Sequence, residues 1–221
     1  MKIAIFCPNW VGDMVMATPA LRAVRRHFAR AEIVAVVRPY VADVLDGLDL
    51  VDRRLLHDPR KSSRSRETGT PPSRGWEFAR RLRAERFDVA LVLPNSFRSA
   101  FWAWMSGARR RVGFERNGRR WLLTDPVAPR PRTTPHPVID EYLRLAKRLG
   151  CRHLSRRMEL AASDADDRQL RAFWQQQPAG EFSERGLVCL NPGGAFGAAK
   201  HWPVTSYAEL ALRLALELDK R

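Results

Sequence analysis

Residues 2–37 read KIAIFCPNWVGDMVMATPALRAVRRHFARAEIVAVV, in which two short apolar runs enclose one amphipathic segment. The runs at 2–6 and 32–37 are apolar and β-branched and predict buried strands. Between them, the Thr-Pro pair at 18–19 predicts a helix start, and apolar side chains continue at helical spacing to about Ala29. A strand, a helix and a second strand in this order predict a parallel pair joined by a right-handed crossover.

The same alternation continues through the first 150 residues. Further strands are expected at 51–56, 88–93 and 111–114, and further helices at 41–45, 76–86, within 94–107 and at 138–149. Strands that alternate with helices predict one parallel sheet covered by helices, which is an α/β fold of Rossmann-like type. Residues 1–150 are therefore interpreted as a complete N-terminal domain.

The later segments depart from this pattern. Residues 57–75 form a polar, basic loop, of a length that is uncommon inside a compact domain unless the loop is functional or mobile. Residues 151–185 are interpreted as a connecting helix and linker. Residues 186–221 are interpreted as the start of a second α/β domain, with a strand at 187–190 and a helix at 205–218. A lone strand and helix leave apolar surface uncovered, so the pattern predicts a truncated second domain.

The net charge of +15 is the largest anomaly of composition. The basic excess is concentrated at 53–86 and 98–132. Such a surface suits nucleic acid, an anionic membrane or a phosphorylated acceptor, and a solvated surface without a dedicated partner is the alternative. No nucleic-acid-binding motif accompanies the arginines, so nucleic acid is the least expected of these partners.

The cysteines and the N-terminus bear on location. Cys7 and Cys189 end apolar runs, so both are expected to be buried free thiols in a reducing compartment. The apolar run at the N-terminus is too short for a signal peptide or a membrane span. These features predict a cytoplasmic protein whose membrane contact is at most peripheral. The histidines show no ligand spacing, so no metal is expected.

Asp13 follows the first expected strand, after Gly12, which permits close approach to the backbone. Ligands of open α/β sheets bind at the carboxyl ends of the strands, where a carboxylate can serve as a general base toward a substrate hydroxyl. A carboxylate that caps a helix start is the structural alternative. Both interpretations stay open from the residues alone.

The stretch NPGGAFGAAKHWP at 191–203 suggests a phosphate site. Gly193 and Gly194 can present backbone amides before a helix, and Lys200 adds a compact positive charge. The stretch does not match the Walker pattern. A flexible connection with a solvated lysine is the alternative.

A third group, Asn95, Ser96 and Arg98, follows the fourth expected strand. These side chains share the carboxyl edge of the sheet with Asp13 and can orient a polyhydroxylated or phosphorylated substrate. The aromatic residues that follow in the same helix are interpreted as core and surface packing rather than as a sugar platform.

Four segments in register resemble the bacterial heptosyltransferases of lipopolysaccharide synthesis, glycosyltransferase family 9, and most closely the heptosyltransferase II branch. They read NWVGDMVMATPAL, LPNSFRSAFWAWMSGARRRVGF, HPVIDEYLRLA and NPGGAFGAAKHWP. The resemblance implies a GT-B fold of two facing Rossmann-like domains. It also implies inverting transfer of L-glycero-D-manno-heptose from ADP-heptose to heptosylated Kdo-lipid A, without a bound metal or another cofactor.

The resemblance further assigns roles to residues. Asp13 matches the catalytic base, and Lys200 the lysine at the donor diphosphate, with Gly193 and Gly194 beside it. The acceptor side is assigned to Asn9, Gly12, Asn95, Ser96 and Arg98. The basic surface then fits the anionic acceptor at the cytoplasmic face of the inner membrane. Family members are about 350 residues long, the size of two ordinary domains, so this chain alone is expected to be inactive. A non-catalytic module that holds anionic glycolipid is the alternative function.

Overall fold

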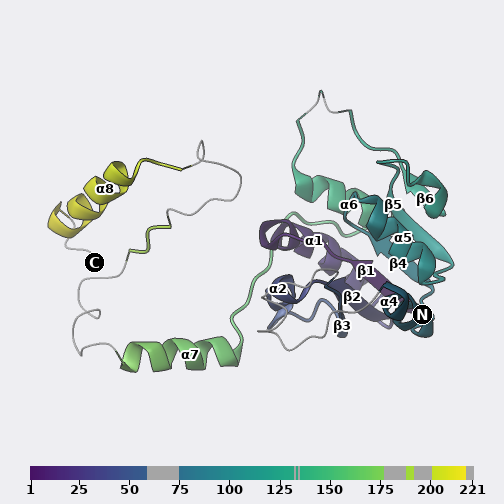
Figure 1. Ribbon diagram of the computed structural model, residues 1–221, viewed down its shortest axis with the longest axis horizontal. Coiled ribbons are helices and arrows are strands. Elements are labelled where there is room, and N and C mark those ends of the chain that lie inside the picture. The colour runs from purple at the N-terminus through teal and green to yellow at the C-terminus, as the bar shows by residue number, and fades with distance from the viewer. Residues whose placement is uncertain (59–74, 132, 134, 177–187, 192–200, 218–221) are drawn as a thin grey trace. The chain divides into compact units, whose positions relative to one another are not determined.

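The computed structural model describes residues 1–58, 75–131, 133, 135–176, 188–191 and 201–217 (Figure 1). Contacts divide the chain into two units, Met1–Ser163 and Asp164–Arg221. The units are described separately below. The domain boundaries expected after residues 150 and 185 stay predictions.

The first unit is built on a parallel sheet of six strands in the order β3-β2-β1-β4-β5-β6. The strands are β1 (Lys2–Phe6), β2 (Glu32–Val37), β3 (Arg53–Leu56), β4 (Val89–Val92), β5 (Arg110–Phe114) and β6 (Asp125–Val127). The helices are α1 (Val11–His27), α2 (Pro39–Ala42), α4 (Gly75–Ala84), α5 (Phe97–Met105) and α6 (Val138–Leu149), with 3₁₀ turns η1 (Asp43–Leu45) and η2 (Arg120–Leu122). This architecture confirms the predicted α/β fold.

Helices cover both faces of the sheet, because successive strand residues point to opposite sides. Ile3 and Ile5 of β1 belong to the apolar cluster that packs against α1 and α6. Ala4 and Phe6 belong to the cluster on the opposite face, which includes buried residues of α4 and α5. Figure 1 shows the sheet between these two layers.

The strand order reverses between β1 and β4. The chain runs outward from β1 through β2 to β3, then returns to place β4 on the other side of β1. Loops that leave the carboxyl ends of these two neighbours diverge to opposite faces and open a crevice between them. The loops after β1 and β4 contain Asn9 and Asn95, so the crevice lies where the sequence predicts the acceptor side.

Helix α1 begins at Val11, so the expected start at Thr18-Pro19 is wrong. Pro19 lies inside the helix and cannot donate a backbone hydrogen bond to the Val15 carbonyl. The Thr18 hydroxyl donates to that carbonyl instead, at 2.7 Å, and satisfies it. The helix can therefore run through a Thr-Pro pair that resembles a helix start in the sequence.

The segment after α6 belongs to the first unit, which ends at Ser163. Gly150 ends α6 with a φ of 108°, a left-handed conformation that favours glycine at the end of a helix. The chain then runs along α1, where the Glu159 amide donates to the Thr18 hydroxyl and Arg22 forms an ion pair with the Glu159 carboxylate at 2.7 Å. Arg156 makes a two-bond contact with Asp140 of α6. These contacts attach residues 151–163 to the first unit.

The second unit contains α7 (Asp164–Gln175) and α8 (Val204–Glu217), close to the predicted helices. The expected strand is absent over Val188–Leu190, which have no regular secondary structure in the described part of the chain. A strand requires a hydrogen-bonded neighbour, and the described residues of this unit include none. Cys189 is consequently exposed, not buried as predicted, whereas Cys7 is buried as predicted.

Candidate functional site

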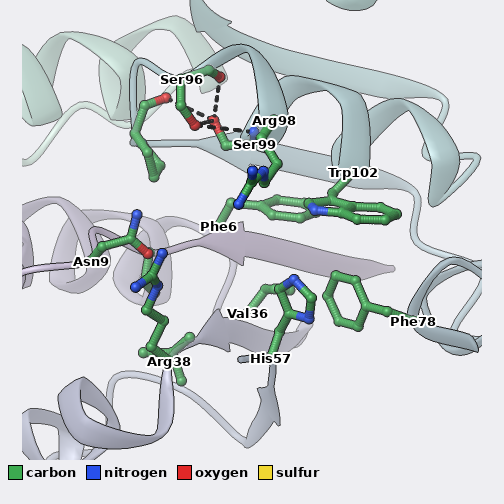
Figure 2. A pocket seen from close by; sticks show the side chains of 13 residues that line it. Phe6, Asn9, Val36, Arg38, His57, Phe78, Ser96, Arg98, Ser99 and Trp102 are labelled. Carbon is green, nitrogen blue, oxygen red and sulfur yellow. Dashed lines mark hydrogen bonds between the residues drawn. The ribbon is translucent and has the colours of Figure 1, made fainter. Parts of the chain in front are cut away.

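A pocket of about 70 Å³ opens at the carboxyl edge of the sheet (Figure 2). Its walls come from the ends of β1 and β2 and from the segments after β3 and β4. The lining residues are Phe6, Cys7, Asn9, Val36, Val37, Arg38, His57, Phe78, Pro94, Ser96, Arg98, Ser99 and Trp102. The pocket therefore lies in the crevice that the reversal of strand order creates.

Two arginines give the pocket its charge. Arg38 follows β2 and Arg98 lies in the first turn of α5, and Figure 2 shows both side chains extending into the same space, with Asn9 beside Arg38. Among the described residues, neither guanidinium forms an ion pair. The Tyr40 hydroxyl donates to the Asn9 carbonyl and so holds the loop after β1. Two unneutralised guanidinium groups in one pocket favour an anionic ligand.

His57 forms the apolar side of the pocket together with two aromatic rings. Its imidazole stacks on Phe78 with ring centroids 3.7 Å apart, and the Trp102 ring packs edge-on at 5.7 Å. Burial, followed by the charge of Arg38, lowers the pKa of His57 from 6.5 to about 4. The imidazole is therefore neutral at physiological pH and adds no charge to the arginine pair.

Replacing Arg38 by glutamine is expected to raise the pKa of His57 above about 4, because it removes a positive charge that opposes the imidazolium. Burial is the larger cause, so the pKa is expected to stay below 6.5. A pH titration of the His57 ring signals by NMR measures the change, with the exposed Arg30→Gln as the control. An identical His57 pKa in Arg38→Gln and in the parent chain would contradict the proximity of the two groups.

The predicted acceptor residues divide into two groups. Asn9, Ser96 and Arg98 line the pocket together, whereas Asn95 does not. Ser96 is also the N-cap of α5, since its hydroxyl accepts from the Ser99 amide at 3.2 Å. The Asn95 side chain instead accepts from Arg119 at 3.4 Å. Arg98 of α5 thus lines the pocket, whereas the Asn95 side chain is exposed outside it and contacts Arg119.

Arg119 is a buried cation that holds this loop. Its side chain is fully buried and donates to the carbonyls of Phe114, Pro94 and Ser96 at 2.7, 2.5 and 3.0 Å. None of its described partners is a carboxylate, and burial lowers the pKa of Arg119 to about 10. The guanidinium therefore remains charged at neutral pH. Its charge-assisted hydrogen bonds join the β4 loop to the end of β5.

Asp13 and Gly12 lie in the first turn of α1, next to the loop that contributes Asn9, but neither lines the pocket. Asp13 is partly exposed, so its carboxylate is accessible. Across the helix pair, Tyr142 of α6 is buried, and burial followed by the charge of Asp13 raises the pKa of the Tyr142 phenol. The phenol is therefore neutral and available as a hydrogen-bond donor near Asp13. The position of Asp13 is compatible with two roles: a general base at the mouth of the crevice, or a carboxylate that stabilises the N-terminus of α1.

The predicted donor residues Gly193, Gly194 and Lys200 lie outside the described residues. Within the part of the chain that the structure describes, no cluster of three His, Cys, Asp or Glu residues is arranged to hold a metal ion. None of the described helices has both the length and the apolar composition required to cross a bilayer.

Sequence reasoning missed Arg38 and Arg119. Arg38 is the first residue after β2, so the rule that singled out Asn95 after β4 also applied to it. Arg119 lies in a loop that contains several arginines. No local signal distinguishes it from the exposed Arg120 beside it, because its burial depends on the distant β4 loop.

A parallel α/β unit with an arginine-lined crevice at its switch point is the arrangement of a Rossmann-like ligand-binding domain. Residues 75–217 match glycosyltransferase family 9 (heptosyltransferase). The chain therefore belongs to glycosyltransferase family 9, as its four motifs predicted.

The relatives agree with this assignment. Lipopolysaccharide heptosyltransferase 2 of Escherichia coli strain K12 is 29% identical in an alignment 230 residues long, which covers 97% of this chain and 60% of that protein. Lipooligosaccharide heptosyltransferase 2 of Haemophilus ducreyi is also 29% identical, over 96% of this chain and 59% of that protein. The chain thus spans about 60% of the length of these relatives.

Solved structures show the same fold. The structure of E. coli ADP-heptose LPS heptosyltransferase II aligns with a TM-score of 0.74 at 27% identity, over 98% of this chain and 62% of that one. A glycosyltransferase family 9 structure from Veillonella parvula aligns with a TM-score of 0.79 at 20% identity, over 98% and 60% of the two chains. These matches confirm the predicted GT-B fold class.

Proposed function

We propose that this chain supplies the acceptor side of a heptosyltransferase. The enzyme would transfer L-glycero-D-manno-heptose from ADP-heptose to the heptosylated Kdo-lipid A core of lipopolysaccharide. The observation that carries the proposal is the arginine-lined crevice beside Asp13 in a chain of this family. A crevice with two cations and amide and hydroxyl groups suits an acceptor that combines carboxylates, phosphates and sugar hydroxyls.

In the proposed reaction, the Asp13 carboxylate accepts the proton of an acceptor heptose hydroxyl. The resulting oxygen nucleophile attacks the anomeric carbon of the donor from the face opposite the diphosphate. The new glycosidic bond forms as the bond to the diphosphate breaks, and ADP leaves with the bonding electrons. This sequence inverts the anomeric configuration and requires a base close to the attacking hydroxyl.

The donor side is proposed by resemblance. Gly193, Gly194 and Lys200 would hold the ADP diphosphate through backbone amides and a positive charge, which stabilises the leaving group as it gains charge. We further propose that the 221-residue chain does not catalyse transfer alone, because it spans about 60% of its relatives. Its place would be the cytoplasm, at the inner face of the membrane that holds the acceptor.

Replacing Arg98 by glutamine is expected to weaken binding of a de-acylated heptosyl-Kdo acceptor about tenfold or more, the usual cost of losing a charge-assisted contact. Calorimetric titration of the 221-residue chain measures the affinity. Arg30→Gln is the matched control, because Arg30 is exposed and precedes β2, at the opposite edge of the sheet. Equal acceptor affinity in the parent chain and in Arg98→Gln would remove the pocket from the proposal.

A further inference from the structure

Helix α5 has a second apolar stripe besides the one that packs on the sheet. Ala100 and Ala103 are fully buried against the core. Phe97, Phe101 and Trp104 recur at the spacing of successive helical turns, and Phe97 and Trp104 are 44% and 45% exposed. Phe101 also packs against the core. A surface helix ordinarily carries polar residues away from its core, so packing within the first unit does not explain why the rings of Phe97 and Trp104 are apolar and exposed.

Neighbouring elements extend the stripe into a continuous aromatic surface. The Trp121 ring lies 6.0 Å from the Phe97 ring, and the Phe101 ring 5.9 Å from the Trp104 ring. Trp76 of α4 lies with Phe101 around an apolar cavity of about 200 Å³. The aromatic surface is thus formed by Trp76, Phe97, Phe101, Trp104 and Trp121, of which Trp76 and Trp121 are 75% and 66% exposed.

Arginines accompany these rings. Exposed arginines on the same elements and in the adjoining loops are Arg80, Arg81, Arg83, Arg98, Arg109 and Arg120. Glu77 is the acidic residue of α4, and α5 contains none. Glu115 is already engaged by Arg120. Arg98 lines the acceptor pocket and Arg120 is paired, but the other arginines still outnumber Glu77, so the elements that carry the aromatic surface have a net positive charge.

We propose that the aromatic surface docks the protein on an anionic phospholipid bilayer. Tryptophan rings are favoured at the boundary between lipid headgroups and acyl chains, and arginines are attracted to anionic headgroups. A second copy of the chain fits this surface less well. In a symmetric dimer the same arginines would face each other, and like charges would oppose association.

The aromatic surface adjoins the acceptor pocket through one side chain. Trp102 lines both the pocket and the cavity beside Trp76. Docking would therefore hold the pocket close to the headgroups in which a lipid-linked acceptor is anchored. The significance of docking for catalysis rests on the proposed function, whereas docking itself is testable without a sugar donor or an acceptor.

The test is flotation of the 221-residue chain with vesicles of phosphatidylethanolamine and phosphatidylglycerol, and with vesicles of phosphatidylcholine. We expect binding to the anionic vesicles that weakens as salt rises. The Trp76→Ser, Trp104→Ser double variant is expected to reduce partitioning at least about tenfold, because it removes two of the four exposed rings from the apolar layer. The Arg80→Gln, Arg83→Gln double variant is expected to reduce binding to anionic vesicles about fivefold for each arginine.

Leu160→Ala is the matched control, because Leu160 is 65% exposed and lies outside the aromatic surface. Circular dichroism establishes that each variant retains its helices. Undiminished flotation of the folded tryptophan variant would overturn the proposal. The proposal would also be overturned if the parent chain floats with neither kind of vesicle but dimerises as its concentration rises, and if the tryptophan variant abolishes that dimer. Neither outcome bears on heptosyl transfer, so failure of docking and failure of the proposed function can be told apart.

Discussion

Replacing Asp13 by asparagine in an active enzyme is expected to lower kcat by about 10²–10⁴-fold, the usual contribution of a general base. The enzyme for this experiment is a hybrid, in which residues 1–221 are joined to the remaining C-terminal part of the E. coli relative. Asparagine preserves the size of the side chain but cannot accept the hydroxyl proton at neutral pH. Affinity for ADP-heptose is expected to be unchanged, because the proposed donor contacts are Gly193, Gly194 and Lys200.

A purely structural carboxylate would behave differently. If Asp13 only stabilises the N-terminus of α1, asparagine should substitute well, with a loss of a few tenths of a kcal/mol of stability and near-normal turnover. Asp43→Asn is the control, because Asp43 is an exposed carboxylate in the η1 turn, outside the crevice. Initial rates of ADP release, with donor affinity measured separately, distinguish the two roles. Near-normal kcat in Asp13→Asn would exclude Asp13 as the base.

The second large effect is expected on stability. Arg119→Met fills a similar volume but donates no hydrogen bonds, so the carbonyls of Phe114, Pro94 and Ser96 each lose one charge-assisted hydrogen bond. Hydrogen bonds to a charged group contribute about 1.5–3 kcal/mol each. Part of that loss is offset because the Arg116 amide still donates to the Phe114 carbonyl, and the Ser99 hydroxyl to the carbonyls of Pro94 and Ser96. We expect a decrease of about 3 kcal/mol or more in the free energy of unfolding.

Urea unfolding of the 221-residue chain measures this change, and Arg120→Met is the matched control. The Arg120 side chain is 70% exposed and pairs with Glu115 at the surface, so its loss is expected to cost less than about 1 kcal/mol. Similar losses in the two variants would contradict the view that Arg119 supports the β4 loop. A loss confined to Arg119→Met would confirm its position in the interior.

Strong local periodicity explains which elements could be predicted. The apolar runs of β1, β2 and β4 and the amphipathic α6 have clear patterns, and Gly150 marks the end of α6. In contrast, β6 is a three-residue strand that contains Pro126, and it exists because β5 provides a parallel neighbour. The start of α1 was misplaced because the Thr18 hydroxyl donates to the Val15 carbonyl within the helix and so compensates for Pro19.

The site was predictable where it follows from strand ends. Asn9, Ser96 and Arg98 meet in one pocket because β1 and β4 are neighbours whose loops open on the same edge. The burial of Arg119 depends on a contact between segments 20 or more residues apart, which a local pattern does not encode. The assignments of Asp13 and of the donor residues rest on resemblance and stay predictions.

The most direct measurement of the central claim is the mass of the acceptor after incubation with the hybrid enzyme and ADP-heptose. If residues 1–221 supply the acceptor side of a heptosyltransferase, mass spectrometry will show an acceptor that has gained one heptose, and Asp13→Asn will suppress that product. An acceptor of unchanged mass, with a hybrid that is folded and still binds ADP-heptose, would contradict the claim.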